Sequence, residues 1–155
     1  MNSIKKYNLL VILSVIGCGF GLQAQNGLKI KKIFDDHANG KGVVMVQLIN
    51  ENMDGFDFGL YKSITIKNNP AVVEQLQKCL EEDQTQADKV KKVESGTGKE
   101  SKSTTFLLLP KRNNLYRLIL YKYENIYKSD QTAILIYIET KSKPDDMLNF
   151  ILKKK

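Results

Sequence analysis

Apolar residues recur at regular spacing along most of this chain, and the period changes from segment to segment. Over Gly27–Ala38 the spacing is helical and Asn39 with Gly40 follows, which predicts a short amphipathic helix. Val43–Ile49 carries apolar and β-branched residues on both faces, which predicts a strand in the centre of a sheet. Asn50–Gly59 contains two glycines and is predicted to be a loop.

The next segment alternates between apolar and polar residues and then returns to helical spacing. The alternation of Leu60–Lys67 predicts a half-buried strand. The Asn69–Pro70 pair is typical of an N-cap and a first helical position, and the apolar stripe behind it predicts a helix to about Asp88. Lys89–Glu94 is a short strand candidate, and Ser95–Ser103 is predicted to be a mobile loop.

Three stronger strand patterns follow, and all are rich in β-branched and aromatic residues. They cover Thr104–Leu109, Leu115–Tyr123 and Gln131–Thr140. Asn113–Asn114 tolerates the positive φ values of a tight turn, so an antiparallel meander is predicted. Pro144 opens a closing helix, whose apolar stripe consists of Met147, Leu148, Ile151 and Leu152.

The predicted order is therefore helix, two strands, helix, four strands and helix. Strands and helices that occur in separate runs indicate an α+β domain. We expect a single domain over residues 25–155, with a mixed or antiparallel sheet of about five to six strands. The helices are expected to pack mainly on one face of this sheet.

The first 24 residues have the pattern of an export signal. The Lys5–Lys6 pair precedes an apolar run over residues 7–20, and Ala24 supplies the small residue before a cleavage site. We therefore predict a signal peptide over residues 1–24 and a periplasmic or secreted protein. Alternatively, Cys18 ends a lipobox and anchors the protein to a membrane as a lipoprotein. In either case no transmembrane span is predicted in the mature chain.

The charge of the chain changes this picture little. The net charge of +7 arises from 24 basic and 17 acidic residues. Only Arg112 and Arg117 are arginine, whereas nucleic-acid readers depend on arginine forks and stacked aromatic rings. The lysines are scattered, as is typical of a solvated surface. We therefore expect no nucleic-acid partner.

Candidate catalytic residues are few. His37 is the only histidine and lies on the apolar stripe of the first helix, so we interpret it as a hydrogen-bonded, partly buried residue. A general base is the alternative. Cys79 lies on the apolar face of the second helix and is interpreted as a packing residue. One histidine and one cysteine on separate helices predict neither a zinc site nor a bound cofactor.

The acidic and glycine-rich segments also have simple interpretations. Asn52, Asp54 and Asp57 lack the spacing of an EF-hand calcium loop and are predicted to form a polar surface loop. Glu81–Asp83 is interpreted as a solvated helix face. Gly96–Lys99 lacks the serine or threonine that completes a phosphate-binding loop, so no nucleotide site is predicted there.

The last two strands present apolar residues on both faces. Ile134, Ile136 and Ile138 share one face with Leu118 and Leu120. The opposite face carries Ile119, Tyr121, Tyr123, Leu135 and Tyr137. Either the first helix or the long loop covers this second face, or it is an interaction face for a protein partner or for a second copy of the chain.

Several segments together carry a resemblance that covers most of residues 25–155. They are Ala24–Gln25, Leu28–Phe34, Lys41–Val43, Tyr61–Ile66, Cys79–Glu81 and Leu135–Glu139. In these segments the chain resembles a family of small exported proteins of unknown function from Bacteroides-type bacteria. The resemblance implies an α+β domain and no assigned activity, so it transfers no functional residue.

These observations favour a non-enzymatic envelope protein that binds a protein or a surface through its tyrosine-bearing sheet face. The alternative is a small periplasmic hydrolase that uses carboxylates or His37. A polar cleft that converges on His37 or on two facing acids is typical of the enzyme. A flat, exposed aromatic face is typical of the binding protein.

Overall fold

The computed structural model describes residues 25–53, 55–96, 100–126 and 130–153. Its elements in chain order are α1 (Ile30–His37), β1 (Val43–Met53), β2 (Phe56–Lys67), α2 (Pro70–Gln84), β3 (Lys89–Ser95), β4 (Glu100–Arg112), β5 (Leu115–Ile126), β6 (Asp130–Thr140) and α3 (Pro144–Lys153). The predicted signal peptide and Cys18 lie outside the described residues.

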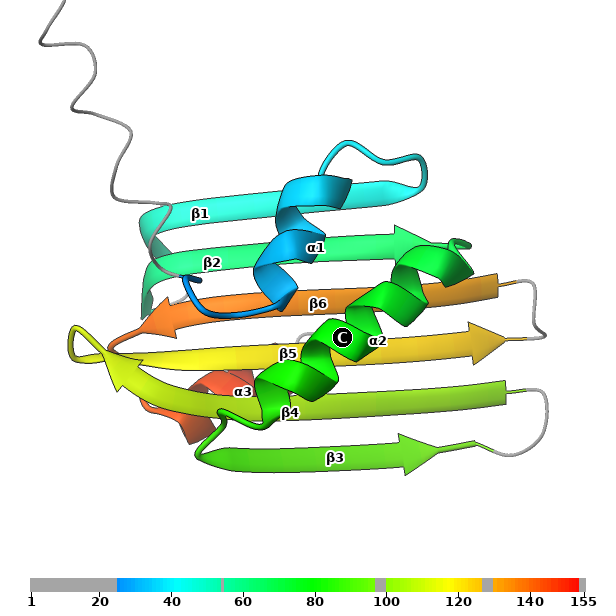
Figure 1. Ribbon diagram of the computed structural model, residues 1–155. Helices are drawn as coiled ribbons and strands as arrows, with labels where there is room; N and C mark the ends of the chain where they lie inside the picture. The colour runs from blue at the N-terminus through cyan, green and yellow to red at the C-terminus, as the bar shows by residue number, and fades with distance from the viewer. Residues whose placement is uncertain (1–24, 54, 97–99, 127–129, 154–155) are drawn as a thin grey trace, which may run out of the picture.

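The six strands form one antiparallel sheet in the order β1-β2-β6-β5-β4-β3 (Figure 1). Helices α1 and α2 lie on one face of this sheet, and α3 lies on the other. The predicted α+β class and element order are confirmed, with two of the three helices on the same face. No helix within the described ranges is long and apolar enough to cross a membrane.

Strand β1 lies at an edge of the sheet, so the prediction of a central position is wrong. Val43 and Met45 pack against the core that α1 covers. Val44 and Val46 lie on the opposite face, where 64% and 44% of their surface is exposed. Apolar residues on both faces of a strand therefore indicated one buried face and one open face in this case.

The β1–β2 hairpin is longer than predicted, because most of the 50–59 segment is strand rather than loop. Pairing resumes at Glu51 opposite Phe58 and continues toward the hairpin end. Phe56 and Phe58 stabilise this extension, since both belong to the hydrophobic cluster on the α3 side. Asn50 has a φ of 53°, which locally interrupts the regular ladder.

The helix and turn chemistry follows the sequence closely. The Asn69 side chain accepts a hydrogen bond from the Val72 amide at 3.3 Å, and Pro70 occupies the first turn of α2. The helix ends at Gln84, before the predicted Asp88. Positive φ values at Asn113 and Asn114 form the predicted β4–β5 turn. Strand β4 begins at Glu100, so the end of the predicted 95–103 loop is strand.

Two hydrophobic clusters occupy the two faces of the sheet. The larger cluster joins α1 and α2 to the inner strands, and the smaller cluster joins α3 to the opposite face. Alternation along β5 and β6 divides their residues between the clusters as predicted, with Leu118 and Ile138 in the smaller one. Met147 of α3 is fully buried there, and Leu148 and Ile151 pack against the same cluster.

Candidate functional site

The tyrosine-bearing face of the sheet is buried, so the predicted alternative of cover by the first helix is correct in part and the alternative of an open interaction face is wrong. Ile119, Leu135 and Tyr137 are each 0% exposed, and Tyr121 is 3% exposed. Tyr123 is partly buried against the same cluster. The cover consists of α1 and α2, which contribute Ile30, Ile33, Phe34, Val72, Val73, Leu76 and Leu80. The rings of Tyr121 and Tyr137 therefore belong to the hydrophobic core.

The two buried tyrosine hydroxyls are engaged within the core. Tyr121 accepts a hydrogen bond from the Gln77 amide at 3.1 Å, and burial raises the pKa of Tyr121 to about 12. Tyr137 accepts from Arg117 Nε at 3.0 Å and donates to Glu139 Oε1 at 2.6 Å. Burial also raises the pKa of Tyr137 above its ordinary value. Both tyrosines therefore satisfy buried polar groups.

His37 lies at the end of α1 and contacts α2 through its side chain. Its Nε2 is 3.0 Å from Gln75 Oε1, and the pair is partly buried. This agrees with the interpretation of a hydrogen-bonded, partly buried histidine. A general base needs a nucleophile or a substrate proton within hydrogen-bond reach, whereas the Nε2 atom of His37 contacts the amide oxygen of Gln75.

Asp83 was interpreted as part of a solvated helix face, and that interpretation is wrong because the residue is 0% exposed. Its two carboxylate oxygens accept the backbone amides of Lys29 at 2.7 Å and Ile30 at 2.9 Å. These donors belong to the N-terminus of α1, whose dipole favours a negative charge. Asp83 therefore fastens the end of α2 to the start of α1. Burial nevertheless raises its pKa.

Cys79 is half-buried and packs against the larger cluster, as the sequence predicted. Burial raises the pKa of its thiol, and the nearby carboxylates of Asp83 and Glu82 add to the effect. The residue lines a groove between α1 and α2 together with Gln75 and several charged side chains. A raised thiol pKa disfavours the reactive thiolate, so Cys79 has a packing role.

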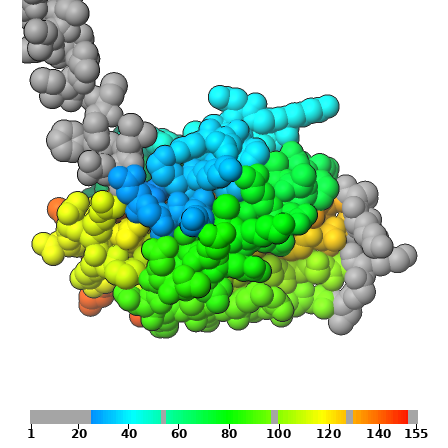
Figure 2. Space-filling model, in the orientation of Figure 1, coloured from blue at the N-terminus to red at the C-terminus, as the bar shows by residue number. Residues whose placement is uncertain are grey.

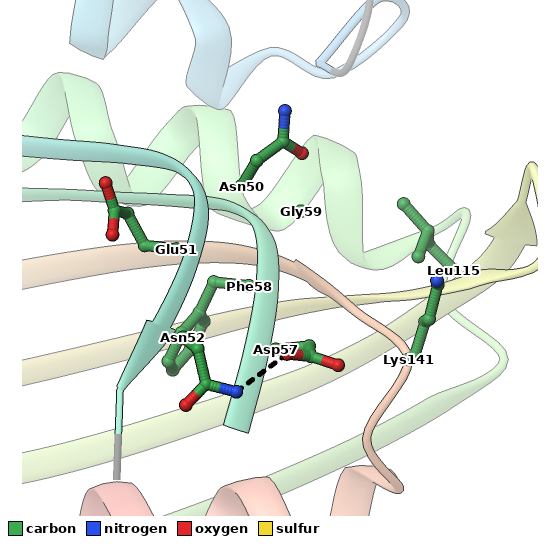
Figure 3. Close-up of a pocket in the computed structure, with 8 residues that line it drawn as sticks. All are labelled: Asn50, Glu51, Asn52, Asp57, Phe58, Gly59, Leu115 and Lys141. Carbon is green, nitrogen blue, oxygen red and sulfur yellow. Dashed lines mark hydrogen bonds between the residues drawn. The ribbon is translucent and has the colours of Figure 1, made fainter. Parts of the chain in front are cut away.

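A small polar cleft of about 390 Å³ lies near the end of the β1–β2 hairpin (Figure 3). Asn52 Nδ2 donates to Asp57 Oδ1 at 2.8 Å across this hairpin, and Lys141 lines the opposite side. Figure 3 shows the carboxylates of Glu51 and Asp57 pointing in different directions. The arrangement therefore lacks two facing acids. Asp54, the third residue of the predicted polar loop, lies outside the described residues.

The open edge of β1 is the most unusual surface in the described part of the chain. Val44, Val46 and Ile49 are 64%, 44% and 47% exposed. From Gly42 to Asn50 the sequence contains no ionisable side chain. Long, apolar edge strands are templates for pairing with a further strand, and natural proteins usually protect them with charges or bulges. We call the regular stretch Val43–Ile49 the β1 edge.

Backbone groups of the β1 edge point away from the sheet at alternate residues. The Lys67 amide donates to the Gly42 carbonyl at 2.9 Å, so this pair is hydrogen-bonded. Hydrogen-bonded and non-hydrogen-bonded pairs alternate along an antiparallel ladder. In the register of β1 with β2, the backbone amide and carbonyl groups of Met45, Gln47 and Ile49 therefore point outward. These backbone groups are available to hydrogen-bond an added strand.

The opposite edge of the sheet, strand β3, is built differently. All seven of its residues are exposed, and two of them, Val90 and Val93, are apolar. Lys89, Lys91 and Lys92 lie among these valines. Lysine side chains on an edge strand disfavour pairing with another strand, because they must lose hydration or meet like charges. Strand β3 is therefore a protected edge, in contrast to the β1 edge.

Sequence reasoning missed the β1 edge although its signal was present. The alternation of Val44, Val46 and Leu48 was visible in the sequence, and so was the absence of charge. The strand order was not visible, and without it the same pattern describes a buried central strand.

No cluster of three or more metal-ligating side chains occurs in the described ranges.

Comparison with known proteins places the chain in a family without adding an activity. No curated protein and no solved structure matches it. A family model described as a family of unknown function matches residues 18–151, which is most of the chain. This agrees with the resemblance to an uncharacterised family that the sequence indicated. The chain therefore belongs to the family of unknown function DUF6108.

Proposed function

We propose that the protein is an exported binding module with no catalytic role, and that it binds by accepting a β-strand along the β1 edge. The observation that carries this proposal is the exposure of Val44 and Val46 beside outward-pointing backbone groups on an uncharged edge strand. In β-strand addition, main-chain hydrogen bonds supply affinity and alternate side chains supply specificity. The β1 edge offers both kinds of contact.

The hydrolase alternative has less support from the geometry. His37 is paired with Gln75, and Asp83 is committed to the N-terminus of α1. The carboxylates of Glu51 and Asp57 diverge at the polar cleft. A hydrolase needs an acid and a base directed at one reacting atom, and the described residues do not converge in this way.

Export is supported by the sequence of residues 1–24, which has a basic start, an apolar run and a small residue at Ala24. Mass spectrometry of the intact protein recovered from the producing cells tests this part of the proposal. The expected mass is that of a chain that begins at Gln25. A chain that begins at an acylated Cys18 would replace the released protein by a membrane-anchored lipoprotein.

Photo-crosslinking in intact cells tests the binding part of the proposal. A photoreactive amino acid replaces Val46 on the β1 edge, and the matched control replaces Val93, which has a similar exposure on β3. A discrete crosslinked adduct is expected from position 46 and none above background from position 93. Equal adducts from both positions, or none from position 46, contradict binding at the β1 edge.

A further inference from the structure

The β1 edge is symmetric about its central residue. Pairing of β1 with β2 is continuous from Val43 to Ile49 and is interrupted at Asn50, whose φ is 53°. Val46 is the middle residue of this regular stretch. A two-fold axis through Val46 would therefore pair the whole stretch with itself in antiparallel orientation.

The backbone groups match in that register. Met45 lies opposite Gln47 of the second copy, and both residues direct their amide and carbonyl groups outward, so they can exchange two hydrogen bonds. On the face away from α1, Val46 lies opposite its own counterpart and Val44 lies opposite Leu48. Cross-strand pairs of β-branched and aliphatic side chains stabilise a sheet. The exposed valines would thus cover one another.

The absence of charge on the stretch is also compatible with self-pairing. The stretch itself holds no ionisable residue, so two copies bring no like charges together along it in spite of the net charge of +7. The regular stretch ends at Gly42, whose φ is 73°, and at Asn50, whose φ is 53°, so the pairing does not extend to the charged residues Lys41 and Glu51.

We infer that the strand accepted by the β1 edge is the β1 edge of a second copy, which gives a two-fold dimer with one continuous sheet. The inference rests on the function proposed above and names its partner. Figure 1 shows β1 at the outer side of the sheet with α1 on one face, and Figure 2 shows the surface of this region from the same side. In the dimer the helices α1 and α2 of both copies lie on the same side of the joined sheet.

A lysine at the two-fold axis tests the dimer. Val46→Lys places two lysines opposite one another, whereas Val93→Lys on the β3 edge is the matched control. Analytical ultracentrifugation at low salt, on protein from the full-length gene, should show a parent dimer that Val46→Lys weakens by roughly tenfold or more and Val93→Lys leaves within about twofold. Equal dimerisation of the two variants contradicts the two-fold interface.

A cysteine at the two-fold axis tests the register. The full-length chain carries Cys18→Ala and Cys79→Ala, so that only an engineered thiol remains. Val46→Cys places two thiols in a non-hydrogen-bonded pair with Cα atoms about 4.5 Å apart, which suits a disulfide. The matched control Val44→Cys separates its thiols by about 13 Å along the strand. Mild oxidation should link the first variant into a dimer and leave the second unlinked.

The outcomes separate the dimer from the more general function. If the protein remains monomeric and Val46→Cys does not crosslink, the dimer is wrong. In that case a photo-crosslink from position 46 to a different protein leaves binding at the β1 edge standing. The absence of any adduct from position 46 overturns both the dimer and the proposed function. Circular dichroism of each variant verifies that these exposed substitutions leave the fold intact.

Discussion

The middle of the sheet and its β1 edge use apolar residues in opposite ways. Tyr121 and Tyr137 are large, carry polar hydroxyls, and are almost completely buried under α1 and α2. Val44 and Val46 are smaller and fully apolar, yet about half of their surface or more is exposed. The comparison teaches that position in the strand order, rather than the size or polarity of a side chain, decides which surface is open in this protein.

The difference has a simple physical origin. Strands β5 and β6 have neighbours on both sides and two helices above them, so their side chains on that face contact other side chains in every direction. Strand β1 has one neighbouring strand, and its side chains on the face away from α1 extend beyond the cover of α3. A hydrophobic side chain is therefore buried only where another element of the fold packs over it.

The largest expected effect comes from a substitution in the buried middle of the sheet. Tyr137→Ala should lower the free energy of unfolding by about 4 kcal/mol, because it removes a fully buried ring and leaves a cavity under the helices. Urea denaturation followed by circular dichroism measures the change. Tyr137→Phe is the control and should cost less, since the ring remains and only the hydroxyl contacts with Arg117 and Glu139 are lost. A loss below about 1 kcal/mol for Tyr137→Ala would show that the ring is not core.

The second-largest expected effect is a loosening of helix α1, which covers the tyrosine-bearing face. Asp83→Ala should lower the free energy of unfolding by about 2–3 kcal/mol, because the amides of Lys29 and Ile30 lose their charged acceptor. Amide hydrogen exchange should accelerate first in α1, since Asp83 holds the N-terminus of that helix. Unchanged exchange in α1 would contradict the fastening role. Glu81→Ala is a suitable control because Glu81 is exposed on the same helix.

The pH dependence of the unfolding free energy separates the effect of the Asp83 charge from the effect of the size and shape of its side chain. Burial raises the pKa of Asp83 from 3.8, so the folded state holds this proton more tightly than the unfolded chain does. The contribution of Asp83 to stability should therefore fall as the pH rises from about 3.8 to the raised pKa, and remain constant above it. Asp83→Asn has no proton to lose and should lack this slope. If the free energy of unfolding varied with pH in parallel for the parent protein and for Asp83→Asn, the raised pKa would be contradicted.

A smaller effect is expected at Cys79, which is intermediate between the two sides of the comparison. Cys79→Ala should cost about 1 kcal/mol, because the side chain is half-buried against the larger cluster. The raised pKa of the thiol predicts slow labelling by a maleimide at neutral pH relative to the unfolded protein. Labelling of the native protein at the unfolded rate would be inconsistent with a packing role.

The smallest effect on stability sharpens the contrast between the two edges. Val46→Lys and Val93→Lys should each change the free energy of unfolding by less than about 0.5 kcal/mol, since both residues are exposed. Association should respond only to Val46→Lys, which places two lysines opposite one another at the centre of the proposed dimer. Ultracentrifugation of the two variants checks this difference. Equal association of both variants would remove the distinction between the edges.

Local sequence patterns determined the identity and order of the elements. The Asn69–Pro70 pair defined the start of α2, and Asn113–Asn114 defined the turn between β4 and β5. Alternation along β5 and β6 divided their residues correctly between two faces. These features depend on residues a few positions apart, so backbone preferences and periodicity are enough to predict them. The apolar, uncharged character of the β1 edge was likewise present in the sequence.

Tertiary structure alone decided which of these surfaces are buried. Pairing of β2 with β6 joins segments far apart in the chain and places β1 at the edge, a result that no local pattern contains. The same long-range packing brings α1 and α2 over the tyrosine-bearing face and directs Asp83 to the start of α1. Periodicity specifies which residues share a face, whereas burial depends on what packs against that face, and packing partners are set by non-local contacts.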